Sequence, residues 1–120
     1  MVRAVRVLVV DDDPAICDSI CDMLGAFGMQ ARSARSGREA LRMCDRVCPF
    51  DVVLADVVMP DIGGVQLAEM LRDRYPAVPV ILMTGRDSMI DGVIDAGTVP
   101  LFKPFASLQL KGVIDDALAD

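Results

Sequence analysis

The sequence predicts an α/β protein in which five parallel strands form one doubly wound sheet, in the strand order 2-1-3-4-5. Short apolar runs rich in β-branched residues alternate with helical patterns along the whole chain. These runs are apolar on successive residues, which is typical of parallel strands covered by helices on both faces. Strand–helix units with right-handed crossovers favour the five-strand order, in which the chain reverses between the first and third strands.

The predicted strands are short, and the second carries the weakest signal because polar residues interrupt it. The fifth strand contains Pro100, which lacks a backbone N–H and therefore favours a position at the edge of the sheet. The order 2-1-3-4-5 places the fifth strand at such an edge. The predicted strands span Ala4–Val10, Met29–Ala34, Asp51–Ala55, Val78–Met83 and Val99–Phe102.

The helices between these strands have recognisable ends. Asp13 followed by Pro14 is typical of an N-cap and a first helical residue, and Gly28 is expected to end that helix. Ser36-Gly-Arg-Glu39 has the spacing of a capping box and begins the second helix. Two further helices are predicted near Val65–Arg74 and Ser107–Ala119.

The segment between Gly85 and Gly97 has a poor helical signal. It contains apolar residues, but Gly92 interrupts them. A doubly wound sheet needs a crossover at this point, between the fourth and fifth strands. We therefore expect the fourth helix to be short or irregular.

Length and composition restrict the class of protein. The chain has 120 residues, 53% of them hydrophobic, which fits a single domain covering residues 1–120. Its apolar runs are far shorter than the roughly 20 residues that cross a bilayer, and no secretory signal opens the chain. We expect a cytoplasmic protein that does not bind membranes.

The net charge of −6 argues against direct binding of nucleic acid, and the absence of histidine excludes histidine chemistry on this chain.

Five polar residues follow four of the predicted strands. Asp11 and Asp12 follow the first, Asp56 the third, Thr84 the fourth and Lys103 the fifth. The carboxyl ends of parallel strands share one edge of the sheet, where ligands bind in this class of fold. These side chains are therefore expected to lie close together.

The chemistry of this set indicates a phosphoryl site with a divalent cation. Three neighbouring carboxylates need a positive partner to remain ionised together, and Mg²⁺ prefers oxygen ligands. A lysine amine and a threonine hydroxyl are suited to phosphate oxygens. Asp56 is the central carboxylate and could act as a nucleophile, because carboxylates form aspartyl-phosphates.

At these residues the chain resembles the receiver domain of two-component response regulators. The segments VLVVDDDP, VVLADVVMP, VILMTG and FKPF match the four signature segments of that family in order, over essentially the whole chain. The resemblance implies a flavodoxin-like, CheY-like fold. It also implies a module that takes a phosphoryl group from a partner and switches conformation to regulate a downstream partner. Such a module catalyses only its own phosphorylation and dephosphorylation.

The resemblance assigns roles to individual residues. Asp56 would be the phosphoacceptor, and Asp12 the main acidic Mg²⁺ ligand. Asp11 would act largely through water, and Val58 would contribute its main-chain carbonyl to the metal. Thr84 would hydrogen-bond the phosphoryl group and Lys103 would pair with it. Asp13 holds a position that varies in the family, and we interpret it as a helix cap.

The chain departs from the family pattern in one region. Receivers usually carry an aromatic switch residue three positions before the lysine, where this chain has Pro100. Together with the short segment before it, this departure resembles receivers at the C-terminus of hybrid histidine kinases. The implied partners are a histidine kinase or histidine phosphotransfer protein, and an effector on another chain or in a missing domain.

Two other functions stay open on the sequence alone. One is a Mg²⁺-dependent phosphatase that works through an aspartyl-phosphate. Phosphatases that resemble haloacid dehalogenases need a second aspartate two residues after the nucleophile, and Val58 stands there. The other is a protein-binding module that is never phosphorylated. The intact acid pair, Asp11 and Asp12, argues against this second function.

The cysteines suggest a zinc site that the fold argues against. Cys17 and Cys21 are four residues apart, as are Cys44 and Cys48, and such pairs can ligate zinc. The resemblance places the two helices that carry them on opposite faces of the sheet. We therefore interpret Cys44 as a small core residue, with Cys17 and Cys21 bordering the apolar stripe of the first helix.

Overall fold

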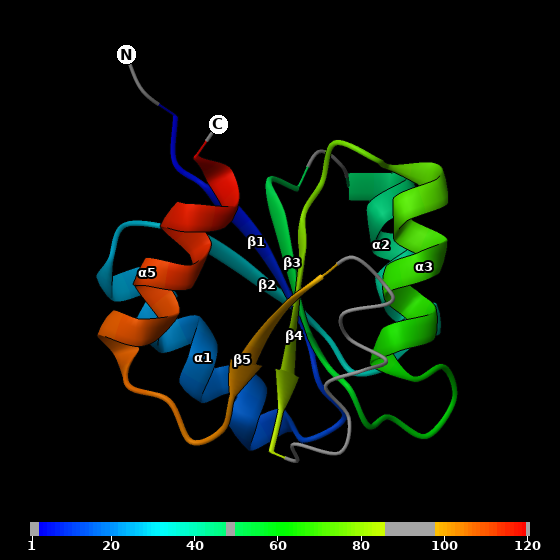
Figure 1. The fold of residues 1–120 in the computed structure, drawn as a ribbon, viewed down its shortest axis with the longest axis horizontal. Coiled ribbons are helices and arrows are strands. Elements are labelled where there is room, and N and C mark those ends of the chain that lie inside the picture. Colours follow the sequence, from blue (N-terminus) through cyan, green and yellow to red (C-terminus); the bar gives the residue numbers. More distant parts are fainter. Residues whose placement is uncertain (1–2, 48–49, 86–97, 120) are drawn as a thin grey trace.

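The computed structural model describes residues 3–47, 50–85 and 98–119. Within them the chain forms one sheet in which every pair of neighbouring strands is parallel. The strand order is β2-β1-β3-β4-β5, which confirms the predicted topology, and Figure 1 shows the strands crossing the middle of the molecule. The strands are β1 (Arg6–Val10), β2 (Gln30–Ala34), β3 (Val52–Asp56), β4 (Val80–Thr84) and β5 (Val99–Phe102).

Helices cover both faces of the sheet. The helices α1 (Pro14–Ala26) and α5 (Ser107–Leu118) pack on one face, and α2 (Gly37–Val47) and α3 (Gly64–Arg74) pack on the other (Figure 1). The fourth helix, expected to be short or irregular, falls mostly on residues 86–97, which lie outside the described residues.

The two cores follow from the alternation of side chains along the strands. Val7 and Val9 point toward α1 and α5, whereas Leu8 and Val10 point toward α2 and α3. All four side chains are fully buried, as expected for a strand covered on both faces. Strand β1 lies between β2 and β3, so both cores extend outward from it.

The predicted helix ends are confirmed at α1 and α2. Asp13 is the N-cap of α1 and its side chain accepts a hydrogen bond from the amide of Ala15. Gly28 follows the end of α1 with φ of +80°, a conformation that favours glycine. At α2, the hydroxyl of Ser36 accepts from the amide of Glu39 at 3.1 Å. These caps set where each helix starts relative to the strand before it.

The cysteine prediction is confirmed for the helix placement. Cys44 lies in the core between the sheet and α2, whereas Cys17 lies in the core on the α1 face. The sheet therefore separates them, and these two thiols cannot ligate one ion. Cys17 is 2% exposed and belongs fully to the core rather than to its border. Cys48 lies outside the described residues.

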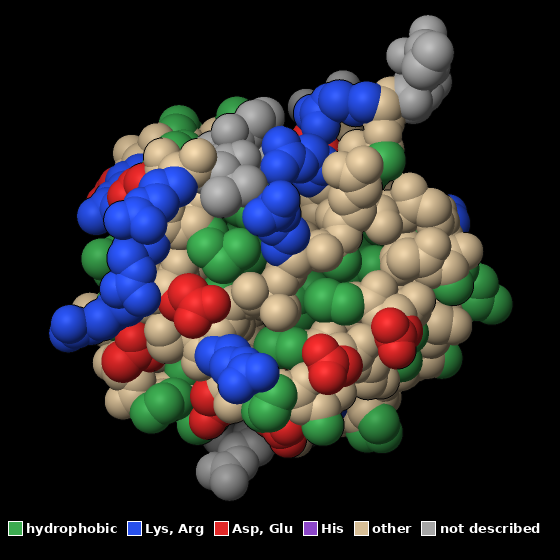
Figure 2. Space-filling model, turned by 180° about the vertical axis from the view of Figure 1, so that it is seen from behind, with side chains coloured by type: hydrophobic (Ala, Val, Ile, Leu, Met, Phe, Trp, Pro, Cys, Tyr) green, Lys and Arg blue, Asp and Glu red, His purple; other side chains and the backbone are tan. Residues whose placement is uncertain are grey.

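Charge is unevenly distributed over the surface. Helix α2 exposes Arg38, Arg42 and Arg46, which lie at intervals of four residues and so share its outer side. Figure 2 shows Lys and Arg side chains gathered in a column along one side of the molecule, the side that α2 and α3 occupy. The net charge of −6 therefore coexists with a basic side.

Each helix in the described part is too short or too polar to span a lipid bilayer.

Candidate functional site

Three carboxylates meet at the carboxyl edge of the sheet. Asp11 and Asp12 directly follow β1, and Asp56 is the last residue of the neighbouring strand β3. One carboxylate oxygen from each lies within 4.8 Å of the other two. Asp11 is buried, Asp56 is half-buried and Asp12 is exposed, so the cluster runs from the core to the surface. The predicted convergence of these three residues is confirmed.

Lys103 bridges two of the carboxylates. It follows β5, and its Nζ atom lies 3.2 Å from Oδ2 of Asp56 and 3.4 Å from Oδ2 of Asp11. Because β5 is separated from β3 by β4, the long side chain of Lys103 reaches across the edge of β4 to make these contacts. The amine of Lys103 therefore lies between the buried carboxylate of Asp11 and the half-buried carboxylate of Asp56.

The electrostatics of this cluster follow from burial and from the pairing with Lys103. Burial raises the pKa of Asp11, and the negative charge of Asp56 raises it further. The hydrogen bond from the amide of Asp13 and the charge of Lys103 lower this pKa, but they offset the rise only in part. Burial alone would lower the pKa of Lys103, but the carboxylates of Asp56 and Asp11 outweigh it and the pKa is raised. Lys103 is therefore held in its charged form, whereas ionised Asp11 is disfavoured.

The backbone around Asp11 is fixed by α1. The amide of Asp13 donates to Oδ1 of Asp11 at 2.9 Å, and Asp13 in turn caps α1. The thiol of Cys17, one turn into α1, donates to the carbonyl of Asp11 at 3.3 Å. Burial and the nearby charge of Asp11 raise the pKa of Cys17 to about 11. The acidic loop is therefore attached to the first turn of α1 through both its side chain and its main chain.

The turn after Asp56 is closed by short backbone contacts. The amide of Val58 donates to Oδ1 of Asp56 at 3.2 Å, and the amide of Gly64 donates to the carbonyl of Val57 at 2.9 Å. A Cβ atom on Gly64 would lie 2.3 Å from the carbonyl oxygen of Asp56, so only glycine fits at the start of α3. The side chain of Val58 is 62% exposed, which places this residue at the mouth of the site.

Thr84 ends β4 between the strands that carry Asp56 and Lys103. Asp56 lies opposite Met83 in the β3–β4 pairing, and Thr84 is the next residue. The amide of Lys103 donates to the carbonyl of Thr84 at 2.8 Å, which fixes the start of the loop after β5. Thr84 is buried at this end of β4.

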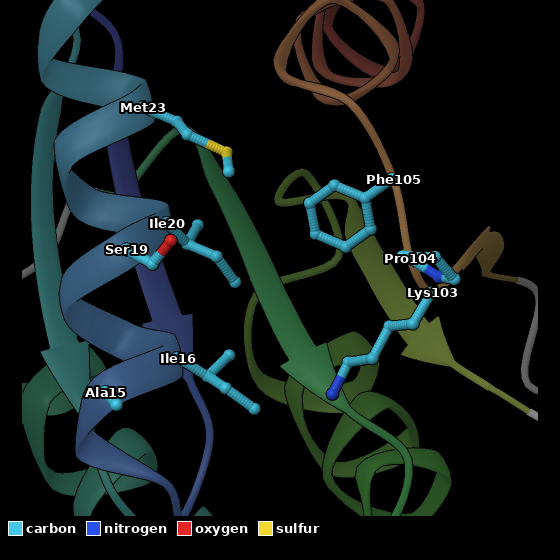
Figure 3. A pocket seen from close by; sticks show the side chains of 8 residues that line it. All are labelled: Ala15, Ile16, Ser19, Ile20, Met23, Lys103, Pro104 and Phe105. Carbon is cyan, nitrogen blue, oxygen red and sulfur yellow. The ribbon is translucent and has the colours of Figure 1, made fainter.

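An apolar pocket opens beside this cluster. It has a volume of about 550 Å³ and lies between α1 and the segment that follows β5. Figure 3 shows Phe105 and Lys103 projecting from that segment toward α1, with Ile16 and Ile20 facing them from the helix. Lys103 thus belongs both to the pocket wall and to the charged cluster. Met23, Ser19, Ala15 and Pro104 complete the lining.

The donor set fits a hard divalent cation. Carboxylate oxygens are the ligands that Mg²⁺ prefers, and one or two carboxylates with several waters are usual for this ion. One ammonium pairs with two of the three carboxylates, so one more positive charge would lower their mutual repulsion. The oxygen-only chemistry agrees with Mg²⁺ better than with zinc, which favours nitrogen and sulfur.

The sequence predicted the members of the site but not all of its contacts. Asp11, Asp12, Asp56 and Lys103 come together as expected, and Thr84 lies beside them. The double contact of Lys103 was not foreseen, because strand order does not specify how far a side chain reaches. Two features were missed. One is the pocket, and the other is the pair of hydrogen bonds that the carboxylate of Asp61 accepts from the amides of Gly37 and Arg38, at the start of α2. The turn-forming sequence MPDIGG was the only signal for the second feature.

An acidic cluster joined to a lysine, at the carboxyl edge of a doubly wound five-stranded sheet, defines a module for phosphoryl signalling. Residues 7–115 match the family described as the response regulator receiver domain. The chain belongs to this family. It therefore has the phosphoacceptor signalling role of a two-component receiver domain.

Individual relatives agree with this assignment. The chain is 39% identical over 109 residues to "Response regulator MprA" of Mycolicibacterium vanbaalenii, an alignment that covers 88% of this chain and 47% of that protein. It is 32% identical to "Transcriptional regulatory protein TrcR" of Mycobacterium tuberculosis, covering 88% of this chain and 42% of that one. The chain thus spans about half the length of these relatives. The chemotaxis protein CheY4 of Vibrio cholerae superposes with a TM-score of 0.89 at 27% identity, covering 97% of this chain and 100% of that one.

Proposed function

We propose that this receiver accepts its phosphoryl group on Asp56, from a phosphohistidine of a partner protein. The observation that carries the proposal is the position of the Asp56 carboxylate. It ends a buried strand, is half-buried, and lies 3.2 Å from the amine of Lys103 beside two further carboxylates. The chain contains no histidine, so the phosphohistidine belongs to the partner.

The transfer forms one bond and breaks another. An oxygen of the Asp56 carboxylate attacks phosphorus in line with the P–N bond of the phosphohistidine. The new P–O bond forms as the P–N bond breaks, and the imidazole leaves with that electron pair and takes up a proton from water. Catalysis is then mostly positioning and stabilisation of charge, so the chain catalyses only its own phosphorylation and the later hydrolysis of the acyl phosphate.

The residues present can hold Mg²⁺ at this site. Asp12 and Asp56 would bind it directly, Asp11 largely through water, and the main-chain carbonyl of Val58 would complete the protein ligands. When bound, Mg²⁺ supplies positive charge that offsets the charge of the transferring phosphoryl oxygens. The exposure of Asp12 and of Val58 supports this assignment, because a phosphorylated partner has to reach the same side of the cluster.

Lys103 and Thr84 would hold the phosphoryl group after transfer. The amine of Lys103 already contacts Asp56, so it can pair with a phosphoryl oxygen after a small movement. Thr84 is the next residue after Met83, which pairs with Asp56 across the two strands, so its hydroxyl can donate to another oxygen. Capture by these groups would favour one of two conformations, which a downstream effector reads.

The partners follow from the same chemistry. A histidine kinase or a histidine phosphotransfer protein would donate the phosphoryl group, in the cytoplasm. The apolar pocket beside Lys103 supports a docking position next to the acceptor, because its walls belong to α1 and to the segment that carries Lys103. The effector would lie on another chain or in a further domain, in agreement with the greater length of the relatives.

The direct test is chemical phosphorylation. Incubation with a small acyl phosphate donor and Mg²⁺ should add one phosphoryl group, which alkali and hydroxylamine remove as expected for an acyl phosphate. Asp56→Asn should abolish the addition, whereas Asp51→Asn is a matched control at an aspartate that binds Arg3 and Arg6 away from the cluster. Labelling of Asp56→Asn at the parent level would show that the acceptor is another residue. Steady release of phosphate from many phosphomonoesters would favour a phosphatase instead.

A further inference from the structure

The carboxylate of Asp61 joins the loop after the proposed phosphoacceptor to helix α2. Its Oδ1 accepts from the amide of Gly37 at 3.3 Å, and its Oδ2 accepts from the amide of Arg38 at 3.2 Å. Gly37 is the first residue of α2 and Arg38 the second, so Asp61 caps this helix from another part of the chain. The connection spans 24 residues of sequence.

The backbone of the two segments is packed closely at the same junction. A Cβ atom on Gly37 would lie 2.8 Å from Cβ of Ile62 and 3.2 Å from its carbonyl oxygen. Cβ of Ile62 is fixed by the main chain, so a larger residue at position 37 has to push the loop away from α2. The loop is therefore held against α2 by an attraction at Asp61 and by close contact at Ile62.

Charge and geometry agree at this junction. Backbone N–H groups, that of Ile62 first and those of Arg38 and Gly37 after it, hold the pKa of Asp61 below its usual value, although burial opposes them. Asp61 is therefore ionised at neutral pH, and its charge is favourable at the N-terminus of a helix. The basic side chain of Arg38 lies 4.0 Å away but is 75% exposed, so the backbone contacts dominate.

The two ends of the loop between β3 and α3 are held by other hydrogen bonds. At its start, the amide of Val57 donates to the carbonyl of Met83 in β4 at 3.0 Å. The amide of Val58 donates to Asp56, and the amide of Gly64 donates to Val57. None of these three hydrogen bonds reaches α2. Asp61, three residues after Val58, therefore links the outer part of this loop to α2.

We propose that Asp61 is a positioning residue for the metal and phosphoryl site. It anchors the loop that carries Val58 to the first turn of α2, and so couples this helix to occupancy of the site. The inference rests on the proposed function, because it takes the Val58 carbonyl as a Mg²⁺ ligand. It adds Asp61 to the proposed site as a residue that touches neither the metal nor the phosphoryl group. It also adds α2 as a helix that responds to the binding of both.

Coupling of this kind works in both directions. If the anchor favours the loop conformation that binds Mg²⁺, then binding of Mg²⁺ strengthens the anchor by the same free energy. The amides of Gly37 and Arg38 should then exchange with solvent more slowly when Mg²⁺ is bound. They should slow further with beryllofluoride, which mimics a phosphoryl group on a carboxylate.

Three variants separate positioning from stability. Asp61→Ala removes the anchor. Ser36→Ala is the matched control, because it also removes a cap from α2, the hydrogen bond from the Glu39 amide, without touching the loop. Gly37→Ala changes the junction from the side of α2 and leaves the sequence of the loop unchanged, in a helix position where alanine is otherwise favourable.

Calorimetric titration with MgCl₂ gives the deciding measurement. Asp61→Ala should weaken Mg²⁺ binding by roughly tenfold, which is the smallest loss of affinity usual for residues that orient metal ligands. Gly37→Ala should weaken Mg²⁺ binding several-fold. Ser36→Ala should leave the affinity unchanged while lowering the unfolding midpoint. Equal affinities for Asp61→Ala and Ser36→Ala would overturn the inference, and if Asp61→Ala does not fold, an unchanged affinity in Gly37→Ala would do the same.

Asp12→Ala tells apart the failure of this inference from the failure of the proposed function. If Asp12→Ala weakens Mg²⁺ binding and neither junction variant does, the site is correct and the anchor has no role in it. If Asp12→Ala also leaves the affinity unchanged, the metal binds elsewhere and both proposals are wrong. Slower exchange at Gly37 and Arg38 on addition of Mg²⁺ supports the coupling without reference to phosphorylation. Exchange there that does not respond to Mg²⁺ contradicts it.

Discussion

The amine of Lys103 lies 3.2 Å from a carboxylate oxygen of Asp56, although 47 residues separate them in sequence. The same amine contacts Asp11, so one ammonium serves two carboxylates. A cation that enters the cluster therefore meets a positive charge already there. Lys103 has opposite effects on the two ligands of the site, because it repels Mg²⁺ and attracts the phosphoryl group.

Lys103→Gln should strengthen Mg²⁺ binding while it impairs phosphoryl capture. Repulsion between an ammonium and a divalent ion about 4 to 6 Å away is roughly 1.4 to 2 kcal/mol even in high dielectric, so the Mg²⁺ affinity should rise by roughly tenfold or more. Calorimetry measures this gain, and labelling with a small phosphodonor measures the loss. Lys111→Gln is the control, since this lysine pairs with Asp115 on α5. A weaker Mg²⁺ affinity in Lys103→Gln would contradict the assignment.

Asp11→Asn should stabilise the protein in the absence of metal. Asp11 is 1% exposed and its pKa is raised mainly by burial, so its ionisation at neutral pH opposes folding. An asparagine keeps an oxygen for the amide of Asp13 but carries no charge. We expect the melting temperature in EDTA to rise by a few degrees, which corresponds to about 1 kcal/mol for a domain of this size.

The pH dependence of this gain has a definite sign. A raised pKa in the folded state means that Asp11 costs no stability below its unfolded value of 3.8, and that stability falls as the pH rises through the raised value. The difference between Asp11→Asn and the parent should therefore be small near pH 4 and larger at pH 7. A difference that decreases over this range would show that pairing with Lys103 outweighs burial.

Much of this site could be predicted because strand ends determine it. Asp11, Asp56 and Lys103 each follow an apolar run, and a parallel sheet brings the carboxyl ends of its strands to one edge. The N-cap at Asp13 and the stop at Gly28 were predictable for a similar reason, because both depend on neighbouring residues alone. Local chemistry and strand order were enough for these features.

Other features depend on distances that no local pattern contains. Asp61 follows a proline in a turn-forming segment, and nothing near it shows that its partner is the start of α2. Cys17 was predicted at the border of the apolar stripe but is buried in the core, where its thiol donates to the carbonyl of Asp11. Ranges of secondary structure cannot specify such contacts, since they arise when separate elements pack together.

The thiol of Cys17 should react slowly at neutral pH while the protein is folded. Burial raises its pKa to about 11, against a usual value of 9.0, so the fraction present as thiolate falls by roughly a hundredfold. Iodoacetamide labelling followed by peptide mass spectrometry should show little modification of Cys17 until denaturant is added. Cys21, half-buried on the same helix, provides the internal comparison. Faster labelling of Cys17 than of Cys21 would show that the first turn of α1 opens readily.

The apolar pocket should matter for a protein donor and not for a small one. Ile16 faces Lys103 and Phe105 across the pocket, and its side chain is partly buried. Ile16→Ser removes apolar surface from the wall but leaves the carboxylates and the lysine in place. Phosphorylation by a small acyl phosphate should then keep its rate, whereas transfer from a phosphorylated histidine kinase should slow by about tenfold or more, as expected when an apolar contact is removed from an interface.

Leu108→Ser is the matched control, because Leu108 is 74% exposed and lies outside the pocket. An equal loss with both donors would mean that Ile16 supports the reacting groups themselves, and an unchanged rate with the kinase would place the docking surface on another face.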